Sequence, residues 1–185
     1  MKRIITIMIL AISTFSVAQE SSKWTVGVGF NSIDNTAKKG TFLYQSKDWN
    51  IAPVASKFSA SYEVQQYFSV ATEVAISKFS GKSEYKGASI YATDVNFIAV
   101  DVNAKYNVDH FFTQAKWFDA SLVGGLGYFW IGEATNRSFN PGVSLDFWFA
   151  DNYGIRVQSL GRIAFENVKL SNNHIQHSVE FVFKF

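Results

Sequence analysis

The chain has 185 residues, of which 48% are hydrophobic and 17% aromatic, and it contains no cysteine. The absence of cysteine excludes both a disulfide framework and a lipid-modified amino-terminal cysteine. The 17 basic residues exceed the 15 acidic ones only through Lys2 and Arg3, so the charge balance gives no reason to expect a nucleic-acid partner.

The first 18 residues are predicted to be a cleaved secretory signal peptide. Lys2 and Arg3 precede an apolar run from Ile4 to Ile12, and small residues around Ala18 fit a cleavage site after it. The apolar run is short for a bilayer-spanning helix, which makes an uncleaved membrane anchor the weaker alternative. Residues 19–185 would then form one domain, and none of their apolar runs is long enough for a transmembrane helix. A chain that is exported, rich in aromatic residues and without a transmembrane helix is favoured to be a β-barrel.

Apolar and polar side chains alternate along eight segments, as in strands that show one face to lipid and the other to an interior. The segments span residues 24–31, 57–63, 68–77, 97–106, 118–130, 139–149, 153–163 and 175–185. An even number of antiparallel strands is required by a closed bacterial barrel of the up-and-down type. A soluble sheet also produces such alternation, so the connections and the charges have to decide between the two.

The connections alternate in length, which favours an outer-membrane barrel. Residues 33–48, 80–93, 131–137 and 164–173 are predicted to be long loops, 64–66 and 150–152 tight turns, and 107–116 an intermediate connection without an assigned role. A turn centred on Gln65 would pair Tyr62 with Phe68 and Lys57 with Glu73. A turn centred on Asp151 would pair Phe149 with Tyr153 and Asp146 with Arg156.

Two sets of residues follow from the predicted faces. The charged residues of the inner face should form a packed ion network, because eight strands enclose a lumen that side chains can fill: Lys57, Glu73, Asp101, Asp119, Asp146, Arg156, Arg162, Glu180 and Lys184. The aromatic residues of the outer face near the short turns should form an interfacial girdle: Trp24, Tyr62, Phe68, Tyr106, Phe118, Phe149 and Tyr153.

Three stretches carry a resemblance to a known family. They are Lys23 to Gly29, the segment from Trp117-Phe118-Asp119 to Val123-Gly124-Gly125-Leu126-Gly127-Tyr128, and the ending His177 to Phe185. With the signal peptide, they resemble the OmpA-type eight-stranded outer-membrane barrels over nearly the whole chain after residue 18. Many relatives continue into a periplasmic peptidoglycan-binding domain, which is not expected here. The resemblance implies that Val179, Phe181, Phe183 and Phe185 form the signal read by the barrel-assembly machinery.

The sequence therefore predicts an all-β, eight-stranded antiparallel up-and-down transmembrane barrel in the bacterial outer membrane. It favours a non-enzymatic role in envelope integrity or in contacts with envelope proteins through the loops 33–48 and 80–93, with lipid as a further partner and no cofactor or metal. A small pore is one alternative, if the interior charges form a conducting path. A lipid-modifying enzyme using His174, His177 and Ser178 is a weaker one, because the side chains at 174 and 177 point to opposite faces and no acid lies beside them.

Overall fold

The computed structural model describes residues 23–34, 50–51, 55–79, 84–85, 88–89, 94–113, 115–166 and 173–185. The predicted signal peptide, residues 35–48 of the first loop and most of residues 80–93 lie outside this part of the chain. Within the described residues, no helix is both long and apolar enough to cross a membrane.

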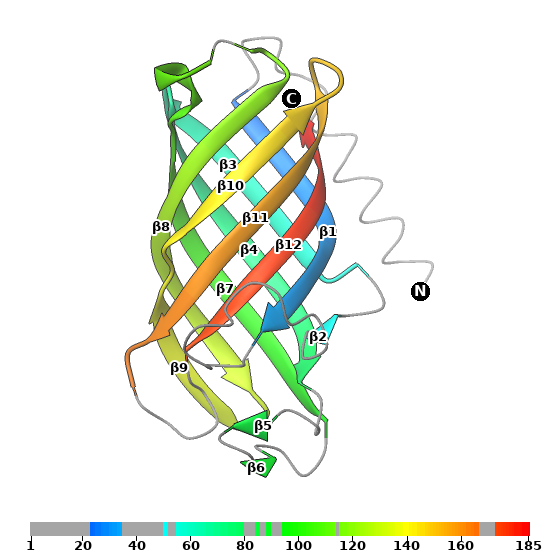
Figure 1. The fold of residues 1–185 in the computed structure, drawn as a ribbon, viewed down its shortest axis with the longest axis vertical. Helices are drawn as coiled ribbons and strands as arrows, with labels where there is room; N and C mark the ends of the chain where they lie inside the picture. The colour runs from blue at the N-terminus through cyan, green and yellow to red at the C-terminus, as the bar shows by residue number, and fades with distance from the viewer. Residues whose placement is uncertain are drawn as a thin grey trace.

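Antiparallel strands tilt around a common axis and close into a barrel (Figure 1). The long strands are β1 (Trp24–Asp34), β3 (Lys57–Gln65), β4 (Phe68–Phe79), β7 (Val95–Asn107), β8 (Phe118–Ile131), β9 (Ala134–Phe139), β10 (Gly142–Trp148), β11 (Tyr153–Ala164) and β12 (His174–Lys184). Consecutive strands of this set pair with each other, except β9 and β10, and β12 pairs with β1 to close the ring. The short β2 (Asn50–Ile51) adds to β1, and β5 (Glu84–Tyr85) pairs with β6 (Ala88–Ser89).

Strands β9 and β10 are two parts of one barrel strand, because both pair with β8 on one side and β11 on the other. They are interrupted at Asn140 and Pro141. Proline has no amide hydrogen for the ladder, but its carbonyl oxygen still accepts a hydrogen bond from Gly161 N at 2.8 Å. Counted in this way, eight antiparallel strands form the barrel, which confirms the predicted fold class.

The predicted loop 131–137 is wrong. β8 continues to Ile131, and the chain turns at Gly132 and Glu133 before β9 begins at Ala134. Gly132 has a φ of +59°, a left-handed conformation that glycine adopts without steric cost. This connection is thus a tight turn between two long strands.

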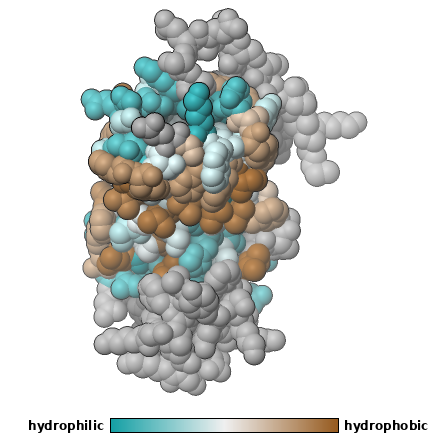
Figure 2. Space-filling view, turned by 45° about the horizontal axis from the view of Figure 1, so that its top comes forward, coloured by the Kyte–Doolittle hydropathy of each residue, from teal (hydrophilic) through white to brown (hydrophobic). Residues whose placement is uncertain are grey.

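The two faces of the barrel differ sharply in polarity. Outward side chains such as Val28, Val102 and Leu126 are 43%, 54% and 60% exposed, whereas the inward Glu73 and Asp101 are fully buried. A hydrophobic band crosses the surface between more polar ends (Figure 2). A contiguous apolar belt of this kind is unfavourable in water and favourable in lipid, so the barrel is inside out relative to a soluble protein.

The strand registers confirm one of the two predicted hairpins and correct the other. Asp146 lies opposite Arg156, as predicted. Tyr62 lies opposite Val70 rather than Phe68, and Lys57 opposite Ala75 rather than Glu73, because the register shifts between Glu63 and Gln65 and the turn falls one residue later. Tyr67 completes this turn with a φ of +67°.

The connection 107–116 contains the 3₁₀ turn η2 (Asp109–Phe111), which lies at the same end of the barrel as the β3–β4 and β10–β11 turns (Figure 1). Asp109 is buried, and its carbonyl oxygen accepts hydrogen bonds from Phe112 N at 2.9 Å and Thr113 N at 2.8 Å. These bonds fold the segment into a compact turn.

Candidate functional site in the barrel lumen

The centre of the lumen is occupied by Glu73 and its partners. Lys57 Nζ lies 2.6 Å from Glu73 Oε2, and Lys105 Nζ lies 3.0 Å from Glu73 Oε1. Gln158 Nε2 also donates to Glu73 Oε1 at 3.0 Å. Three strands separate β4, which carries Glu73, from β11, which carries Gln158, in each direction around the ring. This hydrogen bond therefore joins opposite walls of the barrel.

A second group of contacts crosses the lumen nearer the loop end. Arg162 Nη1 and Nη2 donate to the two carboxylate oxygens of Asp101 at 2.6 and 2.5 Å. Arg162 Nε and Nη2 also donate to Gln176 Oε1 at 3.1 and 2.7 Å, and Asn140 Nδ2 donates to Asp101 Oδ1 at 2.9 Å. The paired geometry of a guanidinium with a carboxylate adds both strength and direction.

Glycines leave room for these contacts. A Cβ at Gly127 would overlap Asp101 Oδ1 and lie 3.0 Å from Arg162 Nη1. A Cβ at Gly27 would lie 2.5 Å from Ser59 Oγ and 2.6 Å from Glu180 Oε2, which are joined by a 2.5 Å hydrogen bond across β1. The network thus depends on glycine at these two positions as well as on the charged side chains.

The short-turn end of the lumen contains a chamber of about 220 Å³. Arg156 Nε and Nη2 donate to the carboxylate of Asp146 at 2.8 and 2.6 Å, and Trp148 Nε1 donates to Asp119 Oδ2 at 2.6 Å. Lys184 also lines the chamber. This polar space ends at the layer built around Glu73, because Lys105 belongs both to the chamber wall and to that layer.

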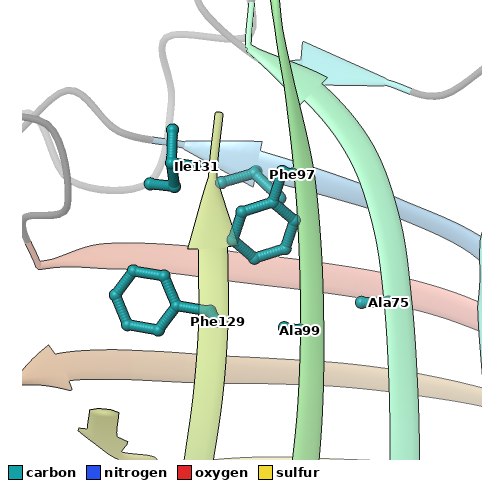
Figure 3. Close-up of a cluster of buried hydrophobic side chains, with 6 residues drawn as sticks. Ala75, Phe97, Ala99, Phe129 and Ile131 are labelled. Carbon is teal, nitrogen blue, oxygen red and sulfur yellow. The ribbon is translucent and has the colours of Figure 1, made fainter. Parts of the chain in front are cut away.

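An apolar cluster fills the loop end of the lumen. Phe97 from β7 and Phe129 from β8 lie on the inside of the barrel (Figure 3), with ring centroids 6.2 Å apart. The cluster also contains Ile33, Ala75, Ala99 and Ile131. His174 packs edge-on against both phenylalanine rings, at 5.4 and 5.1 Å. Side chains therefore occupy the lumen from the chamber to the loop end.

Buried charges in the described lumen are balanced. The basic set is Lys57, Lys105, Arg156 and Arg162, and the acidic set is Glu73, Asp101, Glu180 and Asp146, of which only Asp146 is partly exposed, at 13%. Bringing an isolated charge into such an interior costs several kcal/mol, so equal numbers of both signs make the arrangement tolerable.

No protein-family profile matches the chain, and no curated protein matches it in sequence. Solved structures do match. Neisserial surface protein A is 15% identical with a TM-score of 0.59, covering 90% of this chain and 100% of its own. The amino-terminal β-barrel domain of Pseudomonas aeruginosa OprF is 12% identical with a TM-score of 0.53, over 90% and 100%. Ail of Yersinia pestis, solved with the heparin analogue sucrose octasulfate, is 12% identical with a TM-score of 0.51, over 89% and 99%.

The chain has the fold of the OmpA-type outer-membrane barrels. At these identities the likeness concerns the fold alone, and it spans nearly the whole length of each matched chain. The β3–β4 and β10–β11 turns and η2 lie at one end of the barrel (Figure 1). The residues that line the chamber belong to this end, and the residues of the apolar cluster belong to the other.

The nine charged residues predicted for the interior all lie on inward positions of the strands or at the chamber. Glu73 with Lys57, Asp101 with Arg162 and Asp146 with Arg156 form ion pairs. Glu180 accepts hydrogen bonds from Ser59 and Ser178, and Asp119 accepts one from Trp148. Lys184 lies at the chamber mouth. Lys105 also faces the lumen and forms an ion pair with Glu73, but it is not among the nine predicted residues, although the same alternation places it on the inner face.

The seven aromatic residues predicted as a girdle lie near the short-turn ends of their strands. Trp24 packs on Tyr62 with ring centroids 4.9 Å apart, and Phe68 lies opposite Tyr106. Phe118 packs on Phe147 at 5.3 Å, and Phe149 and Tyr153 both pack near Phe181. Phe147 and Trp117 belong to the same belt but were not predicted as girdle residues.

The residues weighed for catalysis lie on different faces. His174 is buried inside the lumen, Ser178 donates to Glu180 on the same side, and His177 sits on the outward face between Ser32 and Ser159 of the neighbouring strands. His177 therefore cannot exchange a proton directly with Ser178, and His174, although on the same face as Ser178, is four residues away along the extended strand, about 13 Å. In the part of the chain that the structure describes, no group of three or more histidine, cysteine or acidic residues is placed to hold a metal ion.

Proposed function

We propose that this chain is a non-enzymatic protein of the bacterial outer membrane, with a structural or interaction role, and that its lumen does not conduct. The observation that carries the proposal is the link between opposite walls through Glu73 and Gln158, at the level where Lys57 and Lys105 also converge. Ions would have to break buried charge-assisted contacts to pass. The apolar cluster around Phe97 and Phe129 adds a second barrier.

A small pore is the second candidate, and the open chamber at the short-turn end favours it. The two proposals are separated by measuring how fast ions leave vesicles that contain the protein. Vesicles that contain the purified, folded barrel should release a trapped small electrolyte no faster than vesicles that contain heat-denatured protein. Rapid release that depends on the amount of folded barrel would overturn the closed-lumen proposal.

We also propose how the protein reaches the membrane and which parts of it face other molecules. Residues 1–18 act as a cleaved signal peptide, and residues 19–185 form the barrel domain. Surface contacts would involve residues 35–48 and 80–93 of the predicted loops, because Ile33 and Asp34 belong to β1 and loops on a rigid scaffold commonly carry binding functions. The names of the matched surface protein and of the attachment invasion locus protein are compatible with such a role.

The carboxyl-terminal strand is proposed to be the region that the barrel-assembly machinery recognises. Val179 and Phe181 are exposed on the outer face, and Phe183 packs on Phe185 with ring centroids 5.7 Å apart. Phe185 N also donates to Trp24 O at 3.0 Å, next to the closing seam.

Deleting Phe185 should reduce the amount of folded barrel in cells several-fold, because it removes the terminal aromatic and both backbone hydrogen bonds between Phe185 and Trp24 at the seam. The amount is measured as the fraction that shows heat-modifiable gel mobility. Replacing the exposed Phe165 at the opposite end with serine provides a matched loss of one aromatic and should leave this fraction unchanged. Equal fractions for the two variants would contradict the assembly role.

A further inference from the structure

The connection between β7 and β8 exposes an unusual amount of aromatic surface. Phe111 is 71% exposed, Phe112 is 65% exposed and Trp117 is 60% exposed. In a soluble turn such residues would be unfavourable, since large apolar side chains gain most from leaving water. The backbone is compact here, because Asp109 and its hydrogen bonds fold the segment.

Both ends of this connection are continuous with the aromatic belt on the outer wall. At the β7 end, the His110 ring packs edge-on against the Tyr106 ring, with centroids 6.0 Å apart. Its centroid lies 3.9 Å from that of the Phe111 ring. At the β8 end, Trp117 packs on Phe118 at 5.7 Å and on Phe147 at 6.4 Å. Phe111 and Phe112 lie between these two points of attachment.

The charge pattern fits a membrane surface rather than bulk water. Between Val108 and Trp117 the charged residues are Asp109, which is buried, and Lys116, which is exposed. Aromatic rings beside a cationic side chain are the combination that favours the headgroup region of a bilayer. By contrast, the turn between β10 and β11 exposes the acidic Asp151 and the polar Asn152.

We propose that the β7–β8 connection is a membrane-surface anchor, in which Phe111 and Phe112 insert into the lipid leaflet at the short-turn end of the barrel. The proposal rests on the barrel being embedded in lipid, as proposed above. It gives a role to a connection that is longer than the other two turns at this end. The anchor would fix the tilt and depth of the barrel on the β7–β8 side.

Site-directed labelling tests the anchor cleanly, because the chain has no native cysteine. A nitroxide label is placed singly by Phe111→Cys, Phe112→Cys, Asp151→Cys or Val102→Cys, and each labelled protein is first checked for heat-modifiable folding in phosphatidylcholine and phosphatidylglycerol vesicles. Relaxation by lipid-soluble oxygen is then compared with relaxation by a water-soluble nickel chelate.

We expect labels at 111 and 112 to be relaxed several-fold more by oxygen than by the chelate, as the lipid-facing label at 102 should be, whereas the label at 151 should favour the chelate. Labels at 111 and 112 that behave like the one at 151 would overturn the anchor and indicate a surface for a soluble partner. A label at 102 that favours the chelate would instead contradict the lipid-embedded barrel itself, so the two failures are distinguishable.

Discussion

Replacing Glu73 with glutamine should lower the free energy of unfolding by about 3–5 kcal/mol, the usual cost of removing one partner of a buried ion pair. The side chain keeps its size but loses its charge, so Lys57 and Lys105 remain buried without the carboxylate that lies 2.6 and 3.0 Å away. The measurement is the urea midpoint of barrels refolded in phospholipid vesicles, followed by gel mobility and tryptophan fluorescence.

The matched control is Glu63→Gln. Glu63 lines the chamber mouth and is only half-buried, so its replacement should change stability by no more than about 0.5 kcal/mol. Replacing Glu73 and Lys57 together, with glutamine and methionine, should recover much of the loss, because one charge of each sign is removed and the buried charges stay balanced. If Glu73→Gln and Glu63→Gln had the same midpoint, the buried network would not contribute as described.

Replacing Gly127 with alanine should cost about 1–3 kcal/mol, the range for overpacking a well-filled interior. The added methyl group would overlap Asp101 Oδ1 and press on Asn140 Nδ2 at 2.8 Å. Neither side chain can move freely, because Arg162 holds the carboxylate of Asp101 by two hydrogen bonds. The midpoint of urea unfolding in vesicles is again the readout.

Gly124 offers a control on the same strand. A Cβ there would meet nothing within 4 Å, so Gly124→Ala should be neutral or should stabilise the barrel by about 0.4–1 kcal/mol through the entropy of the unfolded chain. A loss at Gly124 as large as that at Gly127 would mean that glycine is needed for backbone reasons and not for the space that the network occupies.

The strands and their faces could be predicted because the side-chain period of a strand is two and one face is strongly apolar. This pattern places Glu73, Asp101 and Glu180 inside and Val102 and Phe181 outside without any knowledge of the neighbours. The closure of β12 on β1 followed from the same argument, since an unpaired edge is unfavourable in lipid, and the register confirms it.

The turns were harder to predict, because their residues do not show clearly at which position the chain reverses direction. The β3–β4 turn contains Gln65, Gln66 and Tyr67 but no glycine, proline, asparagine or aspartate, so pattern alone could not reveal the register shift or the positive φ at Tyr67. The residues around Gly132 are polar enough to suggest a loop. In the structure, however, the residues that follow the turn pair with β8 and form β9.

The contacts across the lumen also could not be predicted from the sequence. Alternation shows that Asp101 and Arg162 face inward, but only the ring order of β7 and β11 brings their side chains together. Lys57 reaches Glu73 even though the predicted register was wrong, because a long flexible side chain can span to a diagonal neighbour. Alternation places Phe97 and Phe129 on the inner face, but it does not predict that they form an apolar cluster there.

Single-channel recording in planar bilayers would show whether side chains close the lumen. Purified, folded barrel should give no steady, reproducible conductance above the bare bilayer in molar salt over a range of voltages, under conditions in which a general porin of known conductance is readily detected. Discrete and reproducible current steps from the pure folded protein would contradict the closed lumen.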